Sequence, residues 1–253
     1  MLNKIHVENC LDTMKRMPDD SVDLVVTSPP YNMNLRISKG KYCSRQIVKE
    51  ISTKYEDFAD NLPIDQFYEF HKEVLTELLR VSNLVFYNIQ IVTGSKRAFF
   101  QLIGDFSENL KEIIVWDKGH GQPAMKEQVL NRRSELLLVF EKDYPISRQF
   151  RTATFERGTL DDVWVIQRER RKSATKHGAT FPEKLVEVIV NNFSKAGDVV
   201  YDPFLGTGTT AYVASKLGRA YIGSEISQEY ADIALERLTH IVSDYHYNKS
   251  ATQ

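Results

Sequence analysis

The sequence TSPPYN (residues 27–32) brings a hydroxyl group, two prolines and an aromatic ring together directly after an apolar run. That run, SVDLVV (21–26), predicts a buried strand, and the prolines end it because neither has an N–H group for the sheet. We therefore expect a stiff turn that presents the Ser28 hydroxyl beside the Tyr31 ring. Taken alone, the hexapeptide is also explained by a rigid corner in which Tyr31 packs against the core.

A second chemical signal is the sequence VVYDPFLGTGTTAYVAS (199–215), which predicts a strand, a glycine turn and a helix. Gly206 and Gly208 allow the backbone to approach a ligand closely. Glu225 ends the next apolar run, where an acid accepts hydrogen bonds from ribose hydroxyls in dinucleotide-binding βαβ units. No GK[ST] follows the glycines, so we expect a nucleoside such as S-adenosylmethionine rather than a nucleotide phosphate. A plain strand-to-helix turn with a solvated Glu225 is the alternative.

The elements that position these residues are predicted from short apolar runs that alternate with amphipathic segments of helical length. This alternation favours an α/β fold with a mainly parallel sheet covered by helices. Strands are expected at 4–9, 21–26, 83–89, 112–117, 135–142, 198–204 and 220–225, and helices at 63–80, 95–104, 181–194, 208–217 and 227–246. The runs 112–117 and 135–142 lack a helix between them and are expected to pair antiparallel at a sheet edge. Thr180, Pro182 and Glu183 predict a helix start with Thr180 as the N-cap.

The composition of the 253 residues is that of a soluble globular protein, with 42% hydrophobic and 26% charged residues. No run of 18 apolar residues indicates a membrane span, and the N-terminus lacks the apolar core of a secretory signal. We therefore expect a cytoplasmic protein without a membrane partner. The two cysteines, Cys10 and Cys43, have the spacing of neither a metal site nor a disulfide framework, so no metal is expected.

Two stretches rich in Lys and Arg do not fit the alternation of strands and helices. Residues 144–177 contain eight basic side chains against four acidic ones, and residues 32–50 contain five before their first acid, namely Arg36, Lys39, Lys41, Arg45 and Lys49. Solvated loops explain either stretch alone. Two such stretches in a chain of net charge −1 favour a polyanionic partner, because phosphate contacts supply most of the non-specific affinity for nucleic acids.

Four segments together resemble the β group of the DNA amino-methyltransferases, which methylate adenine N6 or cytosine N4 with S-adenosylmethionine. They are TSPPYN (27–32), HGATFPEKL (177–185), DPFLGTGTT (202–210) and YIGSE (221–225). The resemblance covers nearly the whole chain, and the catalytic turn precedes the glycine loop, as it does in that group. It implies double-stranded DNA as the substrate and S-adenosylmethionine as the cofactor.

The order of the segments implies a circularly permuted, Rossmann-like methyltransferase fold with a mixed, mainly parallel sheet flanked by helices. Joining the last helix to the N-terminus would give the strands that carry Asp202, Glu225 and Asn9 in succession, then the strand that carries Ser28. Residues 1–143 are accordingly expected to form the catalytic half of one domain, with a mobile basic loop at 32–50. Residues 178–253 would form the cofactor-binding half, and residues 144–177 a short target-recognition insertion.

The resemblance implies a cofactor site of seven residues: Asn9, Phe181, Asp202, Phe204, Gly206, Gly208 and Glu225. Glu225 would hold the ribose hydroxyls, and Phe181 would pack near the methionine moiety. Asn9 stands where the family usually has Asp, and its amide can still accept a hydrogen bond from the adenine amino group. Gly178 replaces a proline that is common in the family.

For catalysis the resemblance implies Ser28, Pro29, Pro30 and Tyr31. The target amino nitrogen is a poor nucleophile because its lone pair is delocalised into the base. The Ser28 hydroxyl and the Pro29 carbonyl would accept its two hydrogens, while Tyr31 stacks on the flipped base. No strong general base is required, in agreement with the lack of a nearby histidine in the sequence. Contacts with the substrate are expected from Asn32, Arg36, Lys39 and Lys41, in the loop predicted to close over the flipped base. Phosphate contacts are expected from Arg168, Arg170, Arg171 and Lys172.

Several alternatives stay open at the level of the sequence. Enzymes that methylate RNA or a protein glutamine use a similar NPPY turn, although their glycine loop comes first. A catalytically idle DNA-binding module of the same fold is a further alternative. Ser in the SPPY motif does not decide between cytosine N4 and adenine N6. A homodimer and a cognate restriction endonuclease both stay open as partners.

Overall fold

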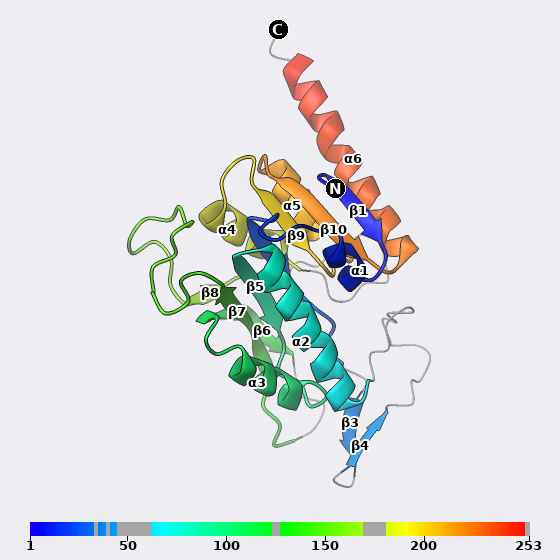
Figure 1. The fold of residues 1–253 in the computed structure, drawn as a ribbon, viewed down its shortest axis with the longest axis vertical. Coiled ribbons are helices and arrows are strands. Elements are labelled where there is room, and N and C mark those ends of the chain that lie inside the picture. The colour runs from blue at the N-terminus through cyan, green and yellow to red at the C-terminus, as the bar shows by residue number, and fades with distance from the viewer. Residues whose placement is uncertain (33–34, 39–40, 45–61, 123–126, 169–180, 251–253) are drawn as a thin grey trace.

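The computed structural model describes residues 1–32, 35–38, 41–44, 62–122, 127–168 and 181–250. Its centre is an eight-stranded sheet built largely from the apolar runs of the sequence (Figure 1). Along the chain the strands are β1 (Lys4–Val7), β2 (Leu24–Thr27), β5 (Leu84–Ile89), β6 (Leu110–Gln122), β7 (Arg132–Glu141), β8 (Val163–Val165), β9 (Val199–Asp202) and β10 (Ala220–Glu225).

The strand order in this sheet is β1-β10-β9-β2-β5-β7-β6-β8. Strands β2 and β5 lie in the middle, where each of their residues is buried. Strands covered on both faces read as continuous apolar runs, which explains why LVVT and LVFYNI show no polar alternation. β7 runs antiparallel to β5 and β6, whereas the other neighbours are parallel. The antiparallel pairing predicted for 112–117 and 135–142 is therefore confirmed.

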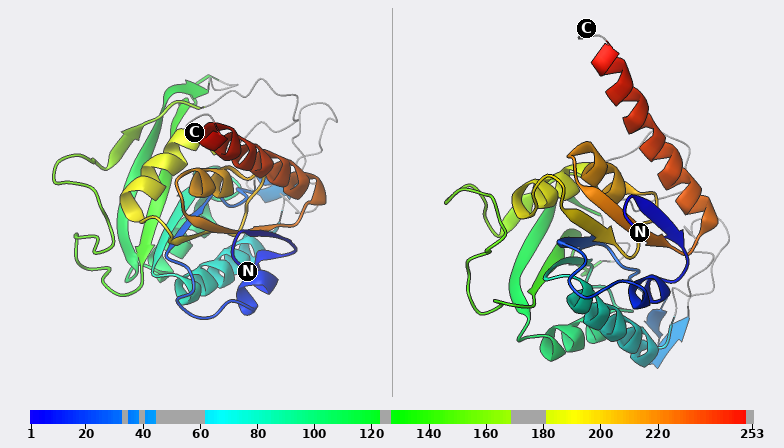
Figure 2. Two further views of the ribbon diagram at one scale, coloured as in Figure 1. Left: turned by 90° about the horizontal axis from the view of Figure 1, so that it is seen from above. Right: turned by 45° about the horizontal axis from the view of Figure 1, so that its top comes forward.

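Helices cover both faces of the sheet (Figure 2). The helices α1 (Cys10–Lys15), α2 (Ile64–Val81) and α3 (Lys96–Asp105) share one apolar cluster with Val25, and α4 (Glu183–Phe193) and α5 (Thr209–Lys216) share another with Leu24. Adjacent strand residues point to opposite faces, so one strand supplies both clusters. α6 (Gln228–Ser250) packs against β1 and α5 through Ala231 and Ala234, and its C-terminal part extends beyond the sheet (Figure 2).

The predicted permutation is confirmed by the pairing of the two ends of the chain. β1 pairs in parallel with β10, for example Val7 with Glu225, and β10 pairs with β9. β9 in turn pairs with β2. The strands that lead to Asn9, Glu225, Asp202 and Ser28 therefore stand in one continuous row, although they come from opposite ends of the sequence.

The structure departs from the predicted elements at several places. β8 pairs outside β6, so the β6–β7 pair does not form the sheet edge. The stretch predicted as a basic loop contains a hairpin of β3 (Leu35–Ser38) and β4 (Lys41–Ser44). α4 begins at Glu183 with Pro182 as its N-cap, so the predicted cap at Thr180, which lies outside the described residues, is wrong. α1 was not predicted because six residues are too short to show a helical period.

The predicted division at residues 143 and 177 stays a prediction. β8 lies inside the 144–177 segment and extends the main sheet, with Trp164 buried against the apolar cluster under α4. Within the described ranges, no helix combines the length and the apolar composition that crossing a membrane requires.

Candidate functional site

The carboxyl ends of the parallel strands meet along one edge of the sheet, and the residues predicted for chemistry follow them there. Ser28 follows β2, the glycine loop follows β9, Glu225 ends β10, and Asn9 comes just after β1. β7 runs in the opposite direction, so its beginning, which contains Glu135, lies at the same edge. Ligands of open α/β sheets bind outside this edge. The topology therefore gathers residues from the whole chain where a ligand is expected.

The SPPY turn forms a rigid corner after β2. Both prolines are buried, and Ser28 and Tyr31 are half-buried. The Ser28 Oγ atom lies 2.7 Å from the Tyr31 hydroxyl and shares a hydrogen bond with it. Thr27, the last residue of β2, donates its hydroxyl proton to the Asp202 carboxylate at 2.7 Å. The turn is thereby tied to the strand that carries the glycine loop.

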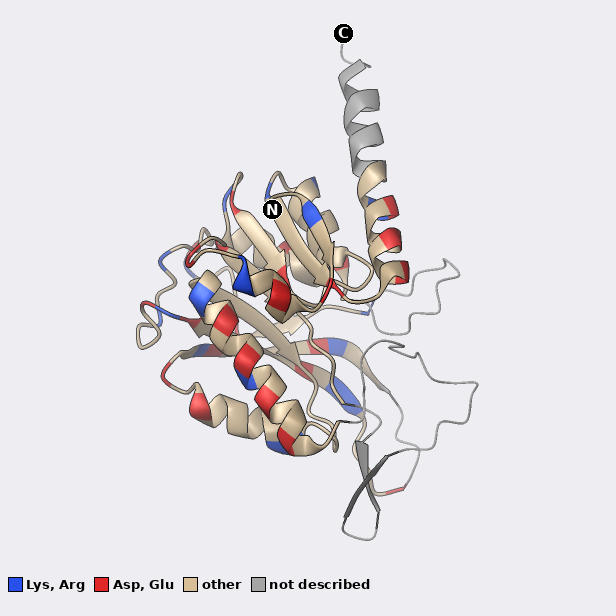
Figure 3. Cartoon of the chain, turned by 45° about the vertical axis from the view of Figure 1, so that its right-hand side comes forward, with Lys and Arg blue, Asp and Glu red and all other residues tan. Residues whose placement is uncertain are grey.

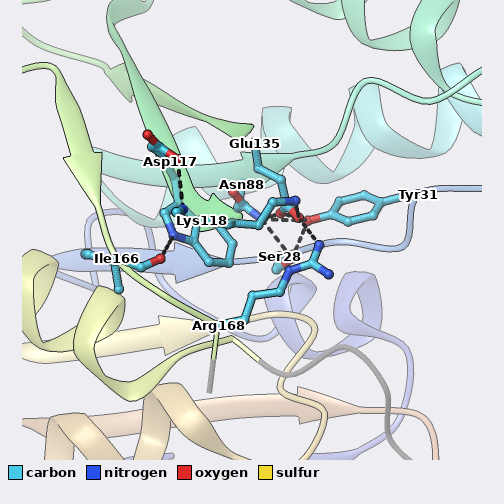
Figure 4. A network of polar contacts seen from close by, with 10 residues as sticks. Ser28, Tyr31, Asn88, Asp117, Lys118, Glu135, Ile166 and Arg168 are labelled. Carbon is cyan, nitrogen blue, oxygen red and sulfur yellow. Dashed lines mark hydrogen bonds and ion pairs between the residues drawn. The ribbon is translucent and has the colours of Figure 1, made fainter. Parts of the chain in front are cut away.

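Two buried residues that the sequence analysis did not identify, Asn88 and Glu135, complete this corner (Figure 4). The Asn88 amide, on β5, donates to the Tyr31 hydroxyl at 2.6 Å and to Glu135 Oε2 at 2.7 Å. Its nitrogen also lies 3.3 Å from Ser28 Oγ. The Tyr31 hydroxyl donates to Glu135 Oε2 at 3.2 Å. The Asn88 Oδ1 atom is buried without a hydrogen-bond partner among the described residues.

Glu135 meets two cations through its other oxygen (Figure 4). Lys118 Nζ donates to Oε1 at 2.9 Å, and Arg168 Nη2 at 3.4 Å. The side chains of Lys118 and Glu135 are only 1% and 6% exposed, so this ion pair lies inside the protein. Burial lowers the pKa of Lys118, and the Glu135 carboxylate acts against this shift. Arg168 was predicted to contact DNA phosphates, but the structure directs its guanidinium toward the catalytic corner.

A histidine lies beneath the turn, which the sequence did not indicate. His71, on α2, is buried among aromatic rings, including that of Phe99, and its Nδ1 atom is hydrogen-bonded to the Tyr87 hydroxyl. Burial lowers the pKa of His71 to about 3, while the backbone of Pro30 acts in the opposite direction. The imidazole is therefore neutral at pH 7, and we assign it a packing role under the turn rather than that of a general base.

The glycine loop lies beside this corner, between β9 and α5. Gly206 has a φ of +53°, and no described atom lies within 4 Å of the position that a Cβ atom would take. Its N–H donates to Glu225 Oε2 at 2.7 Å, and the Ser227 N–H donates to Oε1 at 3.0 Å. Burial raises the pKa of Glu225, and these two hydrogen bonds act against the shift. The loop thus combines open space with a half-buried carboxylate, which suits a polar ligand.

Gly208 and Asp202 also have structural roles that were not predicted: Gly208 in helix packing, Asp202 in hydrogen bonding. A Cβ atom at Gly208 would lie 2.6 Å from the Cβ of Ala234, so this glycine lets α6 pack against the start of α5. Both Asp202 oxygens accept hydrogen bonds, Oδ1 from Thr27 and Oδ2 from Thr210, each at 2.7 Å. Burial raises the pKa of Asp202 to about 6, although these hydroxyls act against the shift. The cofactor contact of either residue stays a prediction.

The remaining predicted cofactor residues, Phe204, Phe181 and Asn9, lie in different parts of the fold. Phe204 packs against the apolar cluster under α2, whereas Phe181 packs on the opposite face of the sheet, where its ring meets Trp116 edge-on. Asn9 is exposed, and its Oδ1 atom accepts the Leu11 N–H as the N-cap of α1. The oxygen that was predicted to meet an adenine amino group is therefore used in the helix cap.

Asn32, at the end of the SPPY turn, lies inside the protein. It is fully buried, has a φ of +54°, and its amide donates to the backbone carbonyls of Leu62 and Gly94. The side chain thus fastens the end of the catalytic turn inside the protein, and its contact with the substrate stays a prediction. A short amide side chain tolerates the left-handed backbone that the turn needs here.

The basic residues predicted to contact DNA fall mostly outside the part of the chain that the structure describes. Arg36 and Lys41 lie on β3 and β4, and their side chains are not described. Outside the described residues altogether are Lys39, Arg170, Arg171 and Lys172.

A sequence signal for the buried network does exist. Glu135 directly precedes the apolar run LLLVF, Lys118 follows EIIVWD, and Asn88 interrupts the otherwise apolar LVFYNI. Charged and amide side chains in central strands are costly to bury unless they are paired. Such residues therefore mark strand ends where a polar cluster forms, although their partners become visible only in the folded sheet.

Solved structures of similar fold include DNA methyltransferases. The PvuII DNA methyltransferase, described as cytosine-N4-specific, has a TM-score of 0.68 and 17% identity, over 94% of this chain and 86% of that one. The M1.HpyAVI–SAM complex has a TM-score of 0.60 and 18% identity, over 93% of this chain and 99% of that one. These likenesses support the predicted Rossmann-like methyltransferase fold.

Sequence comparisons extend the likeness beyond the fold. The type II methyltransferase M.BglII of Bacillus subtilis is 30% identical over an alignment 275 positions long. The alignment covers 94% of this chain and 69% of that protein. The N6/N4 methyltransferase family model, described as DNA methylase, matches residues 22–236. That match contains the SPPY turn, the buried network around Glu135, and the glycine loop with Glu225. The chain therefore belongs to the N6/N4 DNA methylase family.

Proposed function

We propose that this protein transfers the methyl group of S-adenosylmethionine to the exocyclic amino group of a cytosine or adenine flipped out of DNA. The observation that carries the proposal is the hydrogen bond from Thr27 to Asp202, which joins the SPPY turn to the glycine loop on the adjacent strand. An acceptor for an amino group and a candidate nucleoside site are thereby held next to each other. Membership of the DNA methylase family supports DNA as the substrate.

The residues of the glycine loop fit S-adenosylmethionine. The open space at Gly206 allows a ligand to lie close to the backbone. Each oxygen of Glu225 accepts one backbone N–H, and an ionised carboxylate has lone pairs left for two ribose hydroxyls. The loop sequence DPFLGTGTT contains no lysine for a phosphate, as suits a cofactor without one. When bound, S-adenosylmethionine supplies an electrophilic methyl group.

The protein's task is to direct the lone pair of a delocalised amino nitrogen toward that methyl group. We assign Ser28 Oγ and the Pro29 carbonyl as the acceptors of the two amino hydrogens. Because the two prolines fix their own backbone angles and are buried, these acceptors are held in place before the base arrives. A flipped base loses the stacking contacts that it makes in the duplex, and stacking on the Tyr31 ring would replace part of them.

The charge distribution supports DNA binding along the strand-end edge rather than over α2. Asp65, Glu69 and Glu73 lie on the exposed face of α2 and disfavour a phosphate backbone there (Figure 3). Arg132 is exposed at the start of β7, and Arg168 is partly exposed beside the catalytic corner. Arginine side chains near the site attract phosphates and shorten the search for the target base. The description of the relative M.BglII as a type II methyltransferase supports a cognate restriction endonuclease as a genetic partner.

Transfer of tritium from labelled S-adenosylmethionine to duplex DNA, RNA and protein tests the proposal. We expect label in duplex DNA. Label confined to RNA or protein, or absent from all three, would overturn the proposal. Digestion of the labelled DNA to nucleosides, followed by chromatography, then distinguishes N4-methylcytosine from N6-methyladenine.

A further inference from the structure

The two oxygens of Glu135 have different partners. Oε1 faces the cations of Lys118 and Arg168, at 2.9 and 3.4 Å. Oε2 faces the Tyr31 hydroxyl at 3.2 Å and the Asn88 amide at 2.7 Å. The cations therefore fix the orientation of the carboxylate, and Oε2 is held toward the catalytic corner.

A carboxylate in this place determines where the hydroxyl protons point. An ionised carboxylate only accepts hydrogen bonds, and it is a stronger acceptor than a hydroxyl oxygen. Tyr31 has a single hydroxyl proton, which is therefore donated to Glu135 and not to Ser28. The 2.7 Å contact between the two hydroxyls then requires Ser28 to donate its proton to the Tyr31 oxygen. Donation runs in one direction, from Ser28 through Tyr31 to Glu135.

The Asn88 amide does not reverse this direction. It has two hydrogens, and its short contacts, at 2.6 and 2.7 Å, are with Tyr31 and Glu135. Its contact with Ser28 Oγ is the longest of the three, at 3.3 Å. The Ser28 oxygen therefore keeps lone-pair capacity, while its proton is already engaged.

We infer that Glu135 is a positioning residue for methyl transfer: by taking the Tyr31 proton, it keeps Ser28 Oγ an acceptor for the target amino group. The inference rests on the proposed function, because it assigns Glu135 a part in that reaction. Without an acceptor at Oε2, the Tyr31 proton turns toward Ser28 and occupies a lone pair that the amino group needs.

The variant Glu135→Gln tests this role because the side chain keeps its shape and loses its charge. The cations at the Oε1 position hold the amide oxygen, so the amide nitrogen faces Tyr31 and donates to it. We expect kcat for DNA methylation to fall about 10- to 100-fold, as for the loss of one charge-assisted hydrogen bond. The Kd for S-adenosylmethionine, measured by calorimetry, should stay unchanged.

Glu141→Gln is the matched control. Glu141 lies on the same strand, is also buried and pairs with the buried Lys111, far from the catalytic corner along β7. Its kcat should equal that of the wild type at a temperature where both proteins are folded. If Glu135→Gln does not fold, the double variant Glu135→Gln/Lys118→Met, which also removes the unpaired buried cation, takes its place.

Tyr31→Phe separates an effect through the hydroxyl from a general loss of structure. Glu135→Gln should lower kcat strongly in the wild-type background and little further in the Tyr31→Phe background. Equal effects in both backgrounds, or a wild-type kcat in Glu135→Gln, would overturn the inference alone. A wild-type protein that labels no DNA would overturn the proposed function as well, so the two failures are distinguishable.

Discussion

Gly206 and Glu225 are joined by a direct hydrogen bond, in which the Gly206 N–H donates to Glu225 Oε2 at 2.7 Å. The other carboxylate oxygen accepts the Ser227 N–H at 3.0 Å. The carboxylate proposed to hold ribose hydroxyls therefore also fixes the shape of the glycine turn. A change at Glu225 affects both the ligand contact and the loop, and a pair of variants is needed to separate them.

Glu225→Ala is expected to weaken S-adenosylmethionine binding by about 1–3 kcal/mol, because one or two hydrogen bonds to the ribose are lost together with the bond to Gly206. Glu225→Gln keeps the shape and one acceptor oxygen, so its loss of affinity should be smaller. Isothermal titration calorimetry measures both. Unchanged affinity in Glu225→Ala would remove this residue from the cofactor site.

Ser28→Ala should lower kcat by about 100-fold or more, because one of two preorganised hydrogen-bond acceptors at the amino group is lost. Cofactor binding should stay nearly intact, since Ser28 follows β2 and the glycine loop follows β9. Single-turnover methylation and calorimetry on the same preparation give the two values. Lost cofactor affinity with intact turnover at saturating cofactor would show that the SPPY turn has been misassigned.

The two glycines of the loop should respond differently to alanine. At Gly206 the methyl group enters open space, so we expect a stability loss of about 1 kcal/mol from the left-handed backbone, and a clear loss of cofactor affinity. At Gly208 the new Cβ would lie 2.6 Å from that of Ala234, so we expect a larger stability loss, about 1–3 kcal/mol. Urea unfolding and calorimetry compare the two. A larger stability loss in Gly206→Ala, together with a larger loss of cofactor affinity in Gly208→Ala, would contradict the roles assigned to the two glycines.

Much of the fold is readable from the sequence because the central strands are buried on both faces. β10 spans residues 220–225 as predicted, and β5 begins one residue later than predicted. Such strands appear as uninterrupted apolar runs. The hairpin of β3 and β4 and the three residues of β8 lack this pattern and were missed. Short elements with few apolar residues give no periodic signal.

The sequence predicts site residues only where one continuous motif carries them. The SPPY turn and the glycine loop are such motifs, and both lie at the strand-end edge. Glu135, Lys118 and Asn88 come together from three strands, and no spacing in the sequence encodes their contacts. The close approach of Gly208 to Ala234 is likewise not encoded in any spacing, because Ala234 comes from a helix that packs there only in the folded protein.

Two buried groups near the site contribute to stability in opposite ways as pH changes. The pKa of Asp202 is raised by burial to about 6 from 3.8, so between these values the folded protein binds more protons than the unfolded chain. The free energy of unfolding contributed by Asp202 therefore falls as pH rises through this range. The pKa of His71 is lowered by burial to about 3 from 6.5, so its contribution rises with pH. The two effects offset each other between about pH 4 and 6.

Asp202→Asn removes the pH-dependent contribution of Asp202 to the free energy of unfolding and leaves that of His71. Relative to the variant, the wild type should gain up to about 3 kcal/mol in free energy of unfolding as pH falls from about 6.5 to 4, because a shift of about two pKa units corresponds to that energy. Urea unfolding across this range measures the difference. Asp12→Asn, which removes an exposed carboxylate of α1, is the control for the loss of one negative charge. A difference between wild type and Asp202→Asn that stays constant, or shrinks toward acid, would contradict the protonation of a buried Asp202.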